Sequence, residues 1–225
     1  MELNADFTQT VRVANADNPW RASPSAGVER KMLDRVGDEV ARATTIVRFA
    51  PGSAFAPHTH DGGEEYIVLD GVFQDEDGDF PTGTYVRNPP TSRHTPRSDP
   101  GATIFVKLWQ FDPDDRTQLR VDLTDLATAA DPTRSGVSTA CLFEDARERV
   151  TLEVWTPGAR HAFTPDGGAE VLVLSGSIIE GTTHMRPHDW LRLAPGDTTD
   201  LTAGPDGARL WVKTGHLRTV ATAAR

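Results

Sequence analysis

The chain repeats itself, and this feature limits its possible folds more than any other. The segment DGGEEYIVLDG at residues 61–71 matches DGGAEVLVLSG at residues 166–176. With a similar shift along the chain, YVRNPP corresponds to WLRLAP, DPGATIFVKL to GPDGARLWVKT, and GVERKML to GVSTACL. Self-similarity of this kind indicates that one structural unit is built more than once. We therefore predict two tandem copies of a single fold.

The repeat also predicts the domain organisation. By length alone, 225 residues could form one large domain or two small ones. The matching segments favour two domains. The predicted parts are an N-terminal extension at 1–19, a first repeat at 20–111, a linker at 112–132, a second repeat at 133–217 and a C-terminal tail at 218–225.

Each repeat consists of short segments with the composition of β-strands. Examples are VARATTIVRFA, EEYIVLDGVFQ and ATIFVKLWQF, which are rich in Val, Ile, Thr, Tyr and Phe. Gly, Pro and Asp bound these segments, a pattern typical of an all-β sandwich or barrel. We predict an all-β fold without long helices. The best helical candidate is residues 123–130 in the linker, where Asp122 or Thr124 could cap the first turn.

Charge and hydropathy exclude several classes of partner. The net charge is -10 and the pI is about 5.1, and no run of Lys or Arg forms a basic stripe. Because such a surface repels phosphates, we do not expect nucleic acid as a partner. No apolar segment approaches the roughly 20 residues of a membrane span, and the N-terminus lacks the order of a signal peptide. We expect a cytoplasmic protein with no membrane partner.

The single cysteine restricts the chemistry of any metal site. Cys141 alone cannot form an intramolecular disulfide or a thiolate zinc cluster. A metal site would therefore have to use His, Asp and Glu.

Two histidines of the first repeat are spaced to bind one ion. His58 and His60 lie two residues apart in PHTHDGGEEYIVLDG. On a helix these side chains would point to nearly opposite sides, whereas on a strand they share a face. Pro51 and Pro57 disfavour a helix, so we predict an extended segment. Glu64 follows the Asp-Gly-Gly turn, and its carboxylate could reach the same point from the returning strand.

The glycines, histidines and glutamate of this stretch fit the first cupin motif in full. The match is Gly52, five residues, His58-x-His60, three residues, Glu64, six residues and Gly71. A second cupin motif is matched by Gly83, five residues, Pro89 and then His94, except that Thr91 replaces the usual glycine. A chance match of two motifs within a repeated chain is improbable.

The chain thus resembles the ChrR-type cupins, named for the cupin-like C-terminal domain of a zinc-dependent anti-sigma factor. The resemblance covers nearly the whole chain, since bicupin relatives share its length. It implies a jelly-roll β-sandwich in each repeat and one divalent metal ion held by His58, His60, Glu64 and His94. Similar metal-site cupins include dioxygenases that cleave diketones and hydroxyacetophenones.

The second repeat lacks these ligands. In our alignment of the repeats, Phe163 replaces His58, Pro165 replaces His60, Ala169 replaces Glu64 and Thr199 replaces His94. Phe and Ala cannot bind a metal ion, so we expect the second repeat to keep the fold while the first keeps the chemistry. A rearranged site among His161, His184 and His188 is the alternative.

Residues that persist in both repeats are expected to serve the fold. Glu65 is the rival of Glu64 as carboxylate ligand, but Glu170 matches Glu65 where no metal is expected. The same reasoning makes the pairs Lys107 with Lys213 and Arg87 with Arg192 structural.

Two further features have alternative interpretations. The acidic segment DEDGD at residues 75–79 could be a calcium site, but a solvated turn between strands is the commoner structure. Tyr66 and Phe105 are candidates for the wall of a pocket, from strand alternation alone.

The predicted ligand set supports two classes of function. In an octahedral site, four protein ligands leave two positions for substrate or dioxygen, which suits iron(II), manganese or nickel. In a tetrahedral site, the same four ligands saturate zinc. We favour a mononuclear metal-dependent oxygenase acting on a small carbonyl compound, with iron or zinc as the expected metal. The alternative is a zinc-binding sensor without the anti-sigma domain. A homodimer through sheet edges would be consistent with either function.

Overall fold

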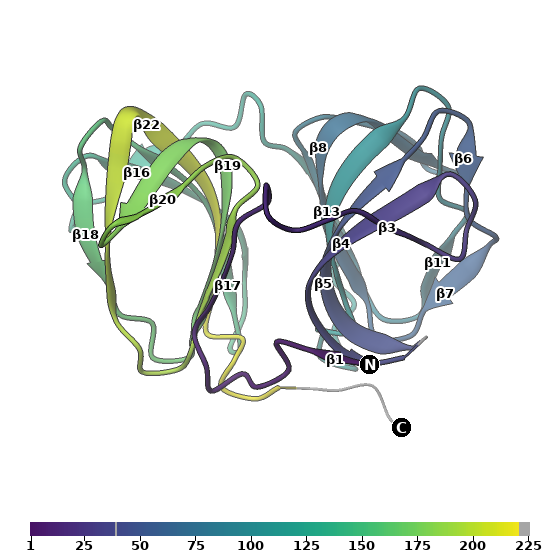
Figure 1. Ribbon diagram of the computed structural model, residues 1–225, viewed down its shortest axis with the longest axis horizontal. Helices are drawn as coiled ribbons and strands as arrows, with labels where there is room; N and C mark the ends of the chain where they lie inside the picture. Colours follow the sequence, from purple (N-terminus) through teal and green to yellow (C-terminus); the bar gives the residue numbers. More distant parts are fainter. Residues whose placement is uncertain (39, 221–225) are drawn as a thin grey trace. The chain divides into compact units, whose positions relative to one another are not determined.

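The computed structural model describes residues 1–38 and 40–220, which divide into two compact units (Figure 1). The first unit contains Met1–Ala5 and Pro19–Asp125, and the second unit contains Asp6–Asn18 and Leu126–Val220. Residues 221–225 of the predicted tail at 218–225 lie outside the described residues. Strands are the only regular elements of the described chain, which agrees with the predicted all-β class.

The first unit is built from one large antiparallel sheet and a small sheet formed by β7 and β11. The main path of the large sheet runs β1-β4-β5-β13-β8-β10-β14. The strands are β1 (Glu2–Leu3), β3 (Arg21–Ala22), β4 (Val28–Gly37), β5 (Ala41–Phe49), β6 (Ser53–Ala54), β7 (His58–His60), β8 (Glu64–Asp75), β9 (Gly78–Pro81), β10 (Thr84–Asn88), β11 (Ser92–His94), β12 (Arg97–Ser98), β13 (Ala102–Leu108) and β14 (Leu119–Asp122).

The second unit repeats this pattern of long and short antiparallel strands. Its path runs β15-β16-β17-β22-β19-β21-β2. The strands are β2 (Val11–Val13), β15 (Ala129–Ala130), β16 (Val137–Glu144), β17 (Arg149–Trp155), β18 (Arg160–Phe163), β19 (Ala169–Glu180), β20 (Thr183–Met185), β21 (Trp190–Leu193) and β22 (Thr199–Thr214).

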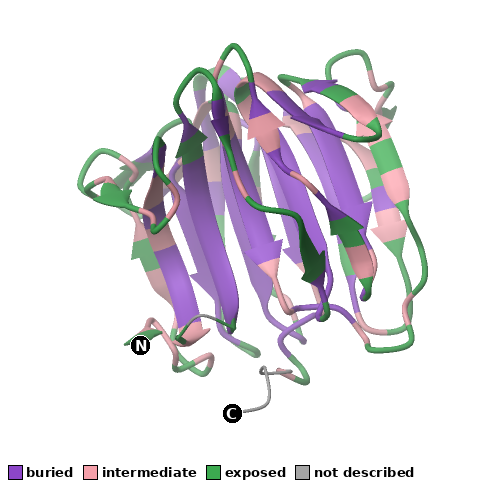
Figure 2. Cartoon of the chain, turned by 90° about the vertical axis from the view of Figure 1, so that its right-hand side faces the viewer, coloured by how far each residue is buried: buried purple, intermediate pink, exposed green. Residues whose placement is uncertain are grey.

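Alternate strand positions supply the apolar interior of each unit. Val28, Val47 and Ile104 are buried in the interior cluster of the first unit, and Val171 and Leu210 in that of the second. Each fully buried side chain of this size stabilises the fold by about 2 kcal/mol relative to an exposed one. Buried residues follow the long strands, and exposed residues lie mainly in the connecting loops (Figure 2).

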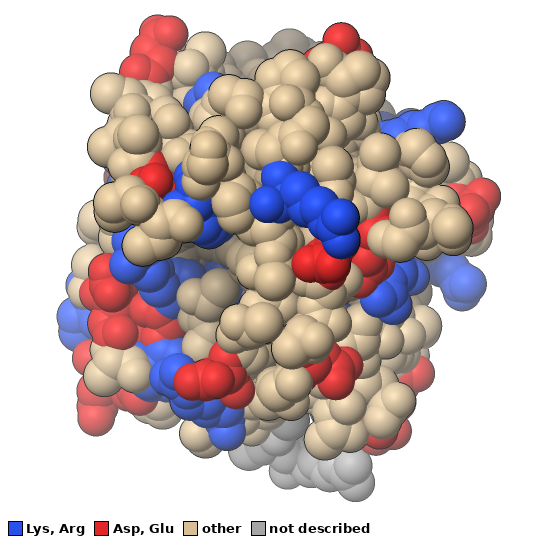
Figure 3. All heavy atoms as spheres, turned by 90° about the vertical axis from the view of Figure 1, so that its left-hand side faces the viewer, with Lys and Arg blue, Asp and Glu red and all other residues tan. Residues whose placement is uncertain are grey.

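Exposed ion pairs contribute less to the fold than this interior does. Acidic and basic side chains lie next to one another on the face drawn in Figure 3. In the second unit, for example, Arg160 and Asp200 form an exposed ion pair of 2.8 Å. Pairs of this kind contribute about 0.2–1 kcal/mol each.

A strand near the N-terminus belongs to the second unit. β2 pairs antiparallel with β21, with Arg12 opposite Leu191. This pairing covers the edge of β21, an exposed row of backbone groups that could otherwise pair with another chain. Residues 6–18, within the predicted extension at 1–19, thus complete a sheet built mainly from the other end of the chain.

The linker contains no helix among its described residues, so the prediction for 123–130 is wrong. β14 ends at Asp122, whose Oδ1 accepts a hydrogen bond of 2.8 Å from the amide of Thr124. The amide of Leu123 donates to the carbonyl of Gly83 at 2.8 Å. An isolated helix of eight residues is marginal in water, so these hydrogen bonds determine the local path instead.

Among the residues that the structure describes, no helix is long and apolar enough to span a membrane.

Candidate metal centre

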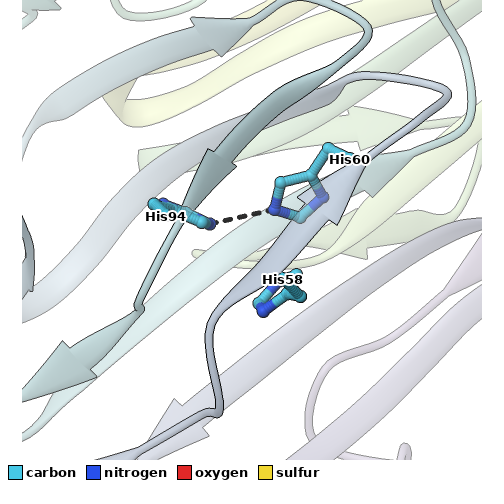
Figure 4. A group of neighbouring side chains, drawn as sticks. All are labelled: His58, His60 and His94. Atoms are coloured by element: carbon cyan, nitrogen blue, oxygen red, sulfur yellow. Dashed lines mark hydrogen bonds between the residues drawn. The ribbon is translucent and has the colours of Figure 1, made fainter.

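His58 and His60 lie on one short strand beside a third histidine. β7 pairs antiparallel with β11 in a register that places His94 opposite His58. The three imidazole rings gather around one point, with ring centroids 4.7–5.4 Å apart (Figure 4). Two neighbouring strands therefore present all three histidines to the same space.

A glycine turn determines the path from β7 to β8. Gly63 has a φ of 75°, which glycine adopts without steric cost. A Cβ atom on Gly62 would lie 2.3 Å from the ring of Trp109, so a side chain there would collide with it. The turn returns the chain beside β7 and places Glu64 at the start of β8.

The nitrogen atoms of the three histidines are spaced as ligands of one ion. Nε2 of His60 lies 2.9 Å from Nε2 of His94. One ligand nitrogen from each ring, including that of His58, lies within 4.8 Å of the others. Two nitrogens bound at about 2.1 Å and at right angles would be about 3.0 Å apart. The separation of His60 and His94 therefore fits adjacent ligands.

Glu64 brings a carboxylate to the same cluster. Its Oε2 lies 3.6 Å from Nε2 of His60 and 3.6 Å from Nε2 of His94. The side chain is buried, and Asn88 donates a hydrogen bond of 3.1 Å to the same oxygen. The structure thus places Glu64 beside two of the three histidines, and these residues with His58 are the four that the cupin resemblance implies.

Hydrogen bonds orient two of the imidazole rings. Nδ1 of His94 lies 3.0 Å from Oδ2 of Asp75, and Nδ1 of His58 lies 2.9 Å from the carbonyl oxygen of Ala56. Each contact requires the proton on Nδ1, which leaves Nε2 unprotonated and able to bind a metal ion. Sequence analysis missed the role of Asp75, although an acid also occupies the matching position in the second repeat.

Burial and charge act differently on the two buried histidines. Burial lowers the pKa of His60, and the charge of Glu64 offsets only part of this effect. Burial alone would also lower the pKa of His94, but the hydrogen bond to Asp75 and nearby carboxylates raise it overall. His60 is therefore the more easily kept neutral, which is the form that binds metal.

Comparison with known proteins agrees with this geometry. Residues 8–112, which include all four candidate ligands, match the family model of the ChrR cupin-like domain. A proposed dioxygenase from Nostoc punctiforme is similar in structure, with a TM-score of 0.78 and 17% identity over 97% of this chain and 87% of that one. Residues 8–112 therefore match a cupin family, and the chain shares its fold with a solved structure over nearly its whole length.

Other solved cupin-like structures bind metals. The bacterial pirin YhhW from Escherichia coli, solved with nickel(II), covers 92% of this chain and 99% of its own chain, at 11% identity and a TM-score of 0.66. Oxalate decarboxylase from Bacillus subtilis, which has Mn(II) centres, covers 95% and 78%, at 12% identity and a TM-score of 0.60. A search of curated protein sequences finds no match. At these identities, the likeness shows a shared fold.

Part of the cluster lines a cavity inside the first unit. The cavity has a volume of about 170 Å³, and His58, His60 and Glu64 contribute to its wall. That volume equals about six water molecules in the liquid. The remaining wall is mostly apolar, with Arg30 and Arg35 as the charged exceptions; its apolar residues include Phe49, Phe55, Phe73, Ile104, Val106 and Leu108.

The predicted pocket residues are not part of this lining. Ile104 and Val106 line the cavity, so Phe105 between them points to the opposite face of β13. Tyr66 lies on the interior face but packs against Phe73. The assignment from alternation was wrong for Phe105, because β13 has buried apolar residues on both faces and alternation does not show which face lines the cavity. Tyr66 has a buried hydroxyl with no hydrogen-bond partner among the described residues.

The acidic segment 75–79 forms the turn between β8 and β9. Its carboxylates have separate partners: Asp75 contacts His94, Glu76 accepts a hydrogen bond of 2.9 Å from the amide of Thr95, and Asp79 accepts one of 2.7 Å from Gln74. Because these groups point to different partners, the segment supports the position of His94 and does not form the alternative calcium site.

Glu65 has a different environment from its neighbour Glu64. Oε1 of Glu65 accepts a hydrogen bond of 2.6 Å from the hydroxyl of Tyr85. The matching Glu170 accepts a hydrogen bond of 3.0 Å from the indole of Trp190. Both carboxylates are buried and bonded to aromatic residues of the neighbouring strand, so they serve the same structural role in both units.

In the second unit, β18 and β22 correspond to β7 and β11 and pair in the same register, but the candidate ligand positions hold other residues. β18 pairs with β22, and Phe163 lies opposite Thr199 just as His58 lies opposite His94. His161 points elsewhere, with Nε2 2.8 Å from the carbonyl oxygen of Ser135. Within residues 1–38 and 40–220, the histidines of the first unit are the sole group with metal-ligand spacing.

Proposed function

We propose that this chain is a mononuclear metal-dependent oxygenase that acts on a small carbonyl compound. The observation that carries the proposal is the cluster of three histidines and Glu64, of which His58, His60 and Glu64 line a small, mainly apolar cavity. Three neutral imidazoles and one carboxylate leave a divalent ion with a net positive charge. Six-coordinate geometry would leave two positions open for substrate or dioxygen.

A bound divalent ion would polarise a carbonyl oxygen, and a redox-active ion would supply dioxygen chemistry. The residues of the chain determine how a substrate meets that site. The phenyl and aliphatic side chains of the wall exclude water and leave little room beyond a small molecule. Asp75 and Asn88 hold His94 and Glu64 in orientations that keep their donor atoms directed at one point.

The metal is proposed to be iron for the oxygenase, with zinc, manganese or nickel as alternatives. Nitrogen and carboxylate donors suit all four ions. Support for a transition metal comes from YhhW, solved with nickel(II), and from the Mn(II) centres of oxalate decarboxylase. The dioxygenase proposed in Nostoc punctiforme supports the oxygenase class.

We propose also that the chain is a bicupin in which the second unit has lost its metal. The repeated strand pairing supports this proposal, because His58 with His94 and Phe163 with Thr199 occupy equivalent pairs. The second interior is filled by apolar side chains, among them Trp155 and Met185.

A zinc-binding sensor is the second candidate, and the match to the ChrR cupin-like domain favours it. Zinc in tetrahedral geometry would be saturated by the three histidines and Glu64. Such a site would leave no position for a substrate and would act by altering the fold for a partner.

The test is oxygen uptake by protein prepared under argon and loaded with iron(II). Pentane-2,4-dione and 2-hydroxyacetophenone are the first substrates to use. We expect substrate-dependent oxygen consumption that is lost in His60→Ala and kept in Thr199→Ala. Tightly held zinc that iron cannot replace, together with no uptake, would contradict the oxygenase and favour the sensor.

A further inference from the structure

Two arginines line the same cavity as the candidate metal ligands. Arg30 and Arg35 both lie on β4 and contribute to the wall together with His58, His60 and Glu64. Guanidinium groups remain charged in proteins. A mainly apolar cavity with two such groups on one wall is a site for an anion.

A β-bulge brings both arginines to the interior. The register between β4 and β5 shifts between Met32 and Asp34, which leaves Leu33 as an extra residue. Arg30 pairs with Val47 before the bulge, and Arg35 pairs with Ala43 after it. An odd and an even position would face opposite sides of a regular strand, but one extra residue reverses the alternation. The sequence pattern alone could not show this.

The arginines and the metal ligands lie on different strands of one curved sheet. A row of paired residues leads from Arg35 to Ala43, from Ala43 to Leu108 and from Leu108 to Glu64. Three strand spacings correspond to about 14 Å along the sheet. Long side chains directed inward from both ends of this row shorten that gap to one that a small molecule can bridge.

Arg30 is available to a ligand. Its guanidinium group forms no ion pair or hydrogen bond with the described residues, and the residue is only partly exposed. Arg35 is buried and donates a hydrogen bond of 3.2 Å to the carbonyl oxygen of Gly37, with a second bond to the carbonyl oxygen of Asp38. Burial and then the charge of Arg30 lower the pKa of Arg35, and Asp38 offsets part of this effect.

The second unit lacks both arginines. Gly27 matches Gly136 at the start of the corresponding strand, and the same bulge recurs there between Cys141 and Phe143. The position of Arg30 is then Thr139, and the position of Arg35 is Glu144. The bulge is therefore part of the shared fold, whereas the arginines occur only beside the histidine cluster.

We infer that Arg30 and Arg35 form an anion-binding wall facing the metal site, and that the substrate is a small carbonyl compound bearing a carboxylate. This inference rests on the proposed oxygenase function for the carbonyl part of the substrate. The planar guanidinium fork matches a carboxylate, and the small volume of the cavity favours a short molecule. The carboxylate contacts the arginines while the carbonyl group points to the histidines.

The test measures binding and does not require turnover. Metal-loaded full-length protein under argon is titrated calorimetrically with 2,4-dioxopentanoate, which has a carboxylate, and with neutral pentane-2,4-dione. We expect the wild type to prefer the acid by about tenfold or more, since hydrogen bonds to charged groups are the strong ones. Arg30→Gln should lose most of that preference and bind the neutral compound within about twofold of wild type.

Two variants control for general effects. Arg48→Gln should change neither affinity, because Arg48 pairs with Glu29 and lies over the ring of Trp20. Arg30→Lys should keep part of the preference, since the charge remains and the fork is lost. Metal content and the circular dichroism spectrum show whether each variant is folded.

The outcomes separate this inference from the proposed function. Equal affinity of the wild type for both compounds, or an equal loss of both in Arg30→Gln, would overturn the anion-binding wall. If pentane-2,4-dione is consumed with oxygen and the acid is not preferred, the oxygenase remains and the wall is wrong. If the acid binds through Arg30 but no oxygen is consumed with either compound, the wall remains and the oxygenase is wrong.

Discussion

The two units differ at one pair of equivalent positions, and this difference bears directly on the candidate metal site. In the first unit, Nδ1 of His94 lies 3.0 Å from Asp75 at the end of β8. In the second unit, Thr199 donates a hydrogen bond of 2.6 Å to Glu180 at the end of β19. Both units thus keep an acid at this point of the framework, but only in the first unit does it contact a candidate metal ligand.

Glu180, the acid of the second unit, also pairs with an arginine, whereas Asp75 of the first unit contacts His94. Arg12 of β2 donates a hydrogen bond of 2.6 Å from Nη2 to Oε1 of Glu180 and forms a second bond through Nε. Paired bonds of this type are strong and directional. In the second unit, β2 therefore supplies an arginine that pairs with this acid. In the first unit, the equivalent acid contacts a histidine.

The interiors of the two units also differ at an equivalent aromatic position. Phe49 lies opposite Val28, and Trp155 lies opposite the matching Val137; both belong to the apolar cluster of their unit, and Phe49 also lines the cavity. The second unit therefore has the larger aromatic side chain at the same register position. The comparison indicates that the same strand framework can carry a candidate metal site or a packed apolar interior. A few side chains that point into each unit make the difference.

The largest expected effect is the loss of the metal from His60→Ala. Removing one of the three imidazoles should abolish metal retention after gel filtration, because ligand count determines affinity. Thr199→Ala changes the equivalent of His94 in the second unit and should leave metal content unchanged. Loss of metal from both variants, measured by elemental analysis, would show that our alignment of the units is wrong.

A smaller effect is expected from the two adjacent glutamates. Glu64→Gln should weaken metal binding by about a hundredfold or more, since it removes the carboxylate charge beside His60 and His94. Glu65→Gln should change the metal affinity by less than about threefold, because the Glu65 carboxylate accepts a hydrogen bond from Tyr85. Competition with a chromogenic chelator measures both constants. The reverse order would make Glu65 the ligand.

Asp75→Asn should weaken metal binding by about tenfold. The hydrogen bond that holds the proton on Nδ1 of His94 would become weaker, and loss of such partners costs about 10–100-fold in affinity. The matched control is Glu180→Gln, which should not change metal affinity. If both variants retain the wild-type constant in the chelator competition, Asp75 does not support the site.

The smallest effect concerns stability and pH in the second unit. The hydrogen bond from Arg12 lowers the pKa of Glu180, with a further contribution from Thr199. A lowered pKa stabilises the fold above the unfolded-state value, and this contribution is lost as pH falls through the folded-state value. The Tm difference between wild type and Glu180→Gln should therefore be present at pH 7 and shrink below about pH 4.5.

Glu144→Gln is the control for this pH dependence. Glu144 forms an exposed pair of 3.7 Å with Arg149, and exposed pairs contribute little. The Tm of Glu144→Gln should match that of wild type at pH 7 and at pH 3.5. A Tm difference for Glu180→Gln that stays constant from pH 7 to pH 3.5 would contradict the role of the Arg12 pair.

Much of the fold could be predicted from the sequence because repeats and strand composition are local signals. The pairing of His58 with His60 on one face follows from strand geometry, and the structure shows them on β7. The linker helix at 123–130 was wrong, because tertiary hydrogen bonds such as that from Leu123 to Gly83 outweigh a weak local propensity.

The support of the candidate site was harder to predict because it depends on contacts distant in sequence. Asp75 looks like part of a solvated acidic turn until the fold brings it to His94, 19 residues away. The bulge at Leu33 shifts the alternation of β4, so the inward position of Arg35 could not be derived from the pattern. The pairing of β2 with β21 joins segments far apart in the chain.

The central claim is that the first unit holds one metal ion and the second holds none. The most direct measurement is the metal-to-protein ratio of chain prepared under argon, loaded with iron(II) or zinc and freed of unbound ion. Our account predicts a ratio of about one, with no metal left in His60→Ala. A ratio near two, or a ratio of one that persists in His60→Ala, would contradict it.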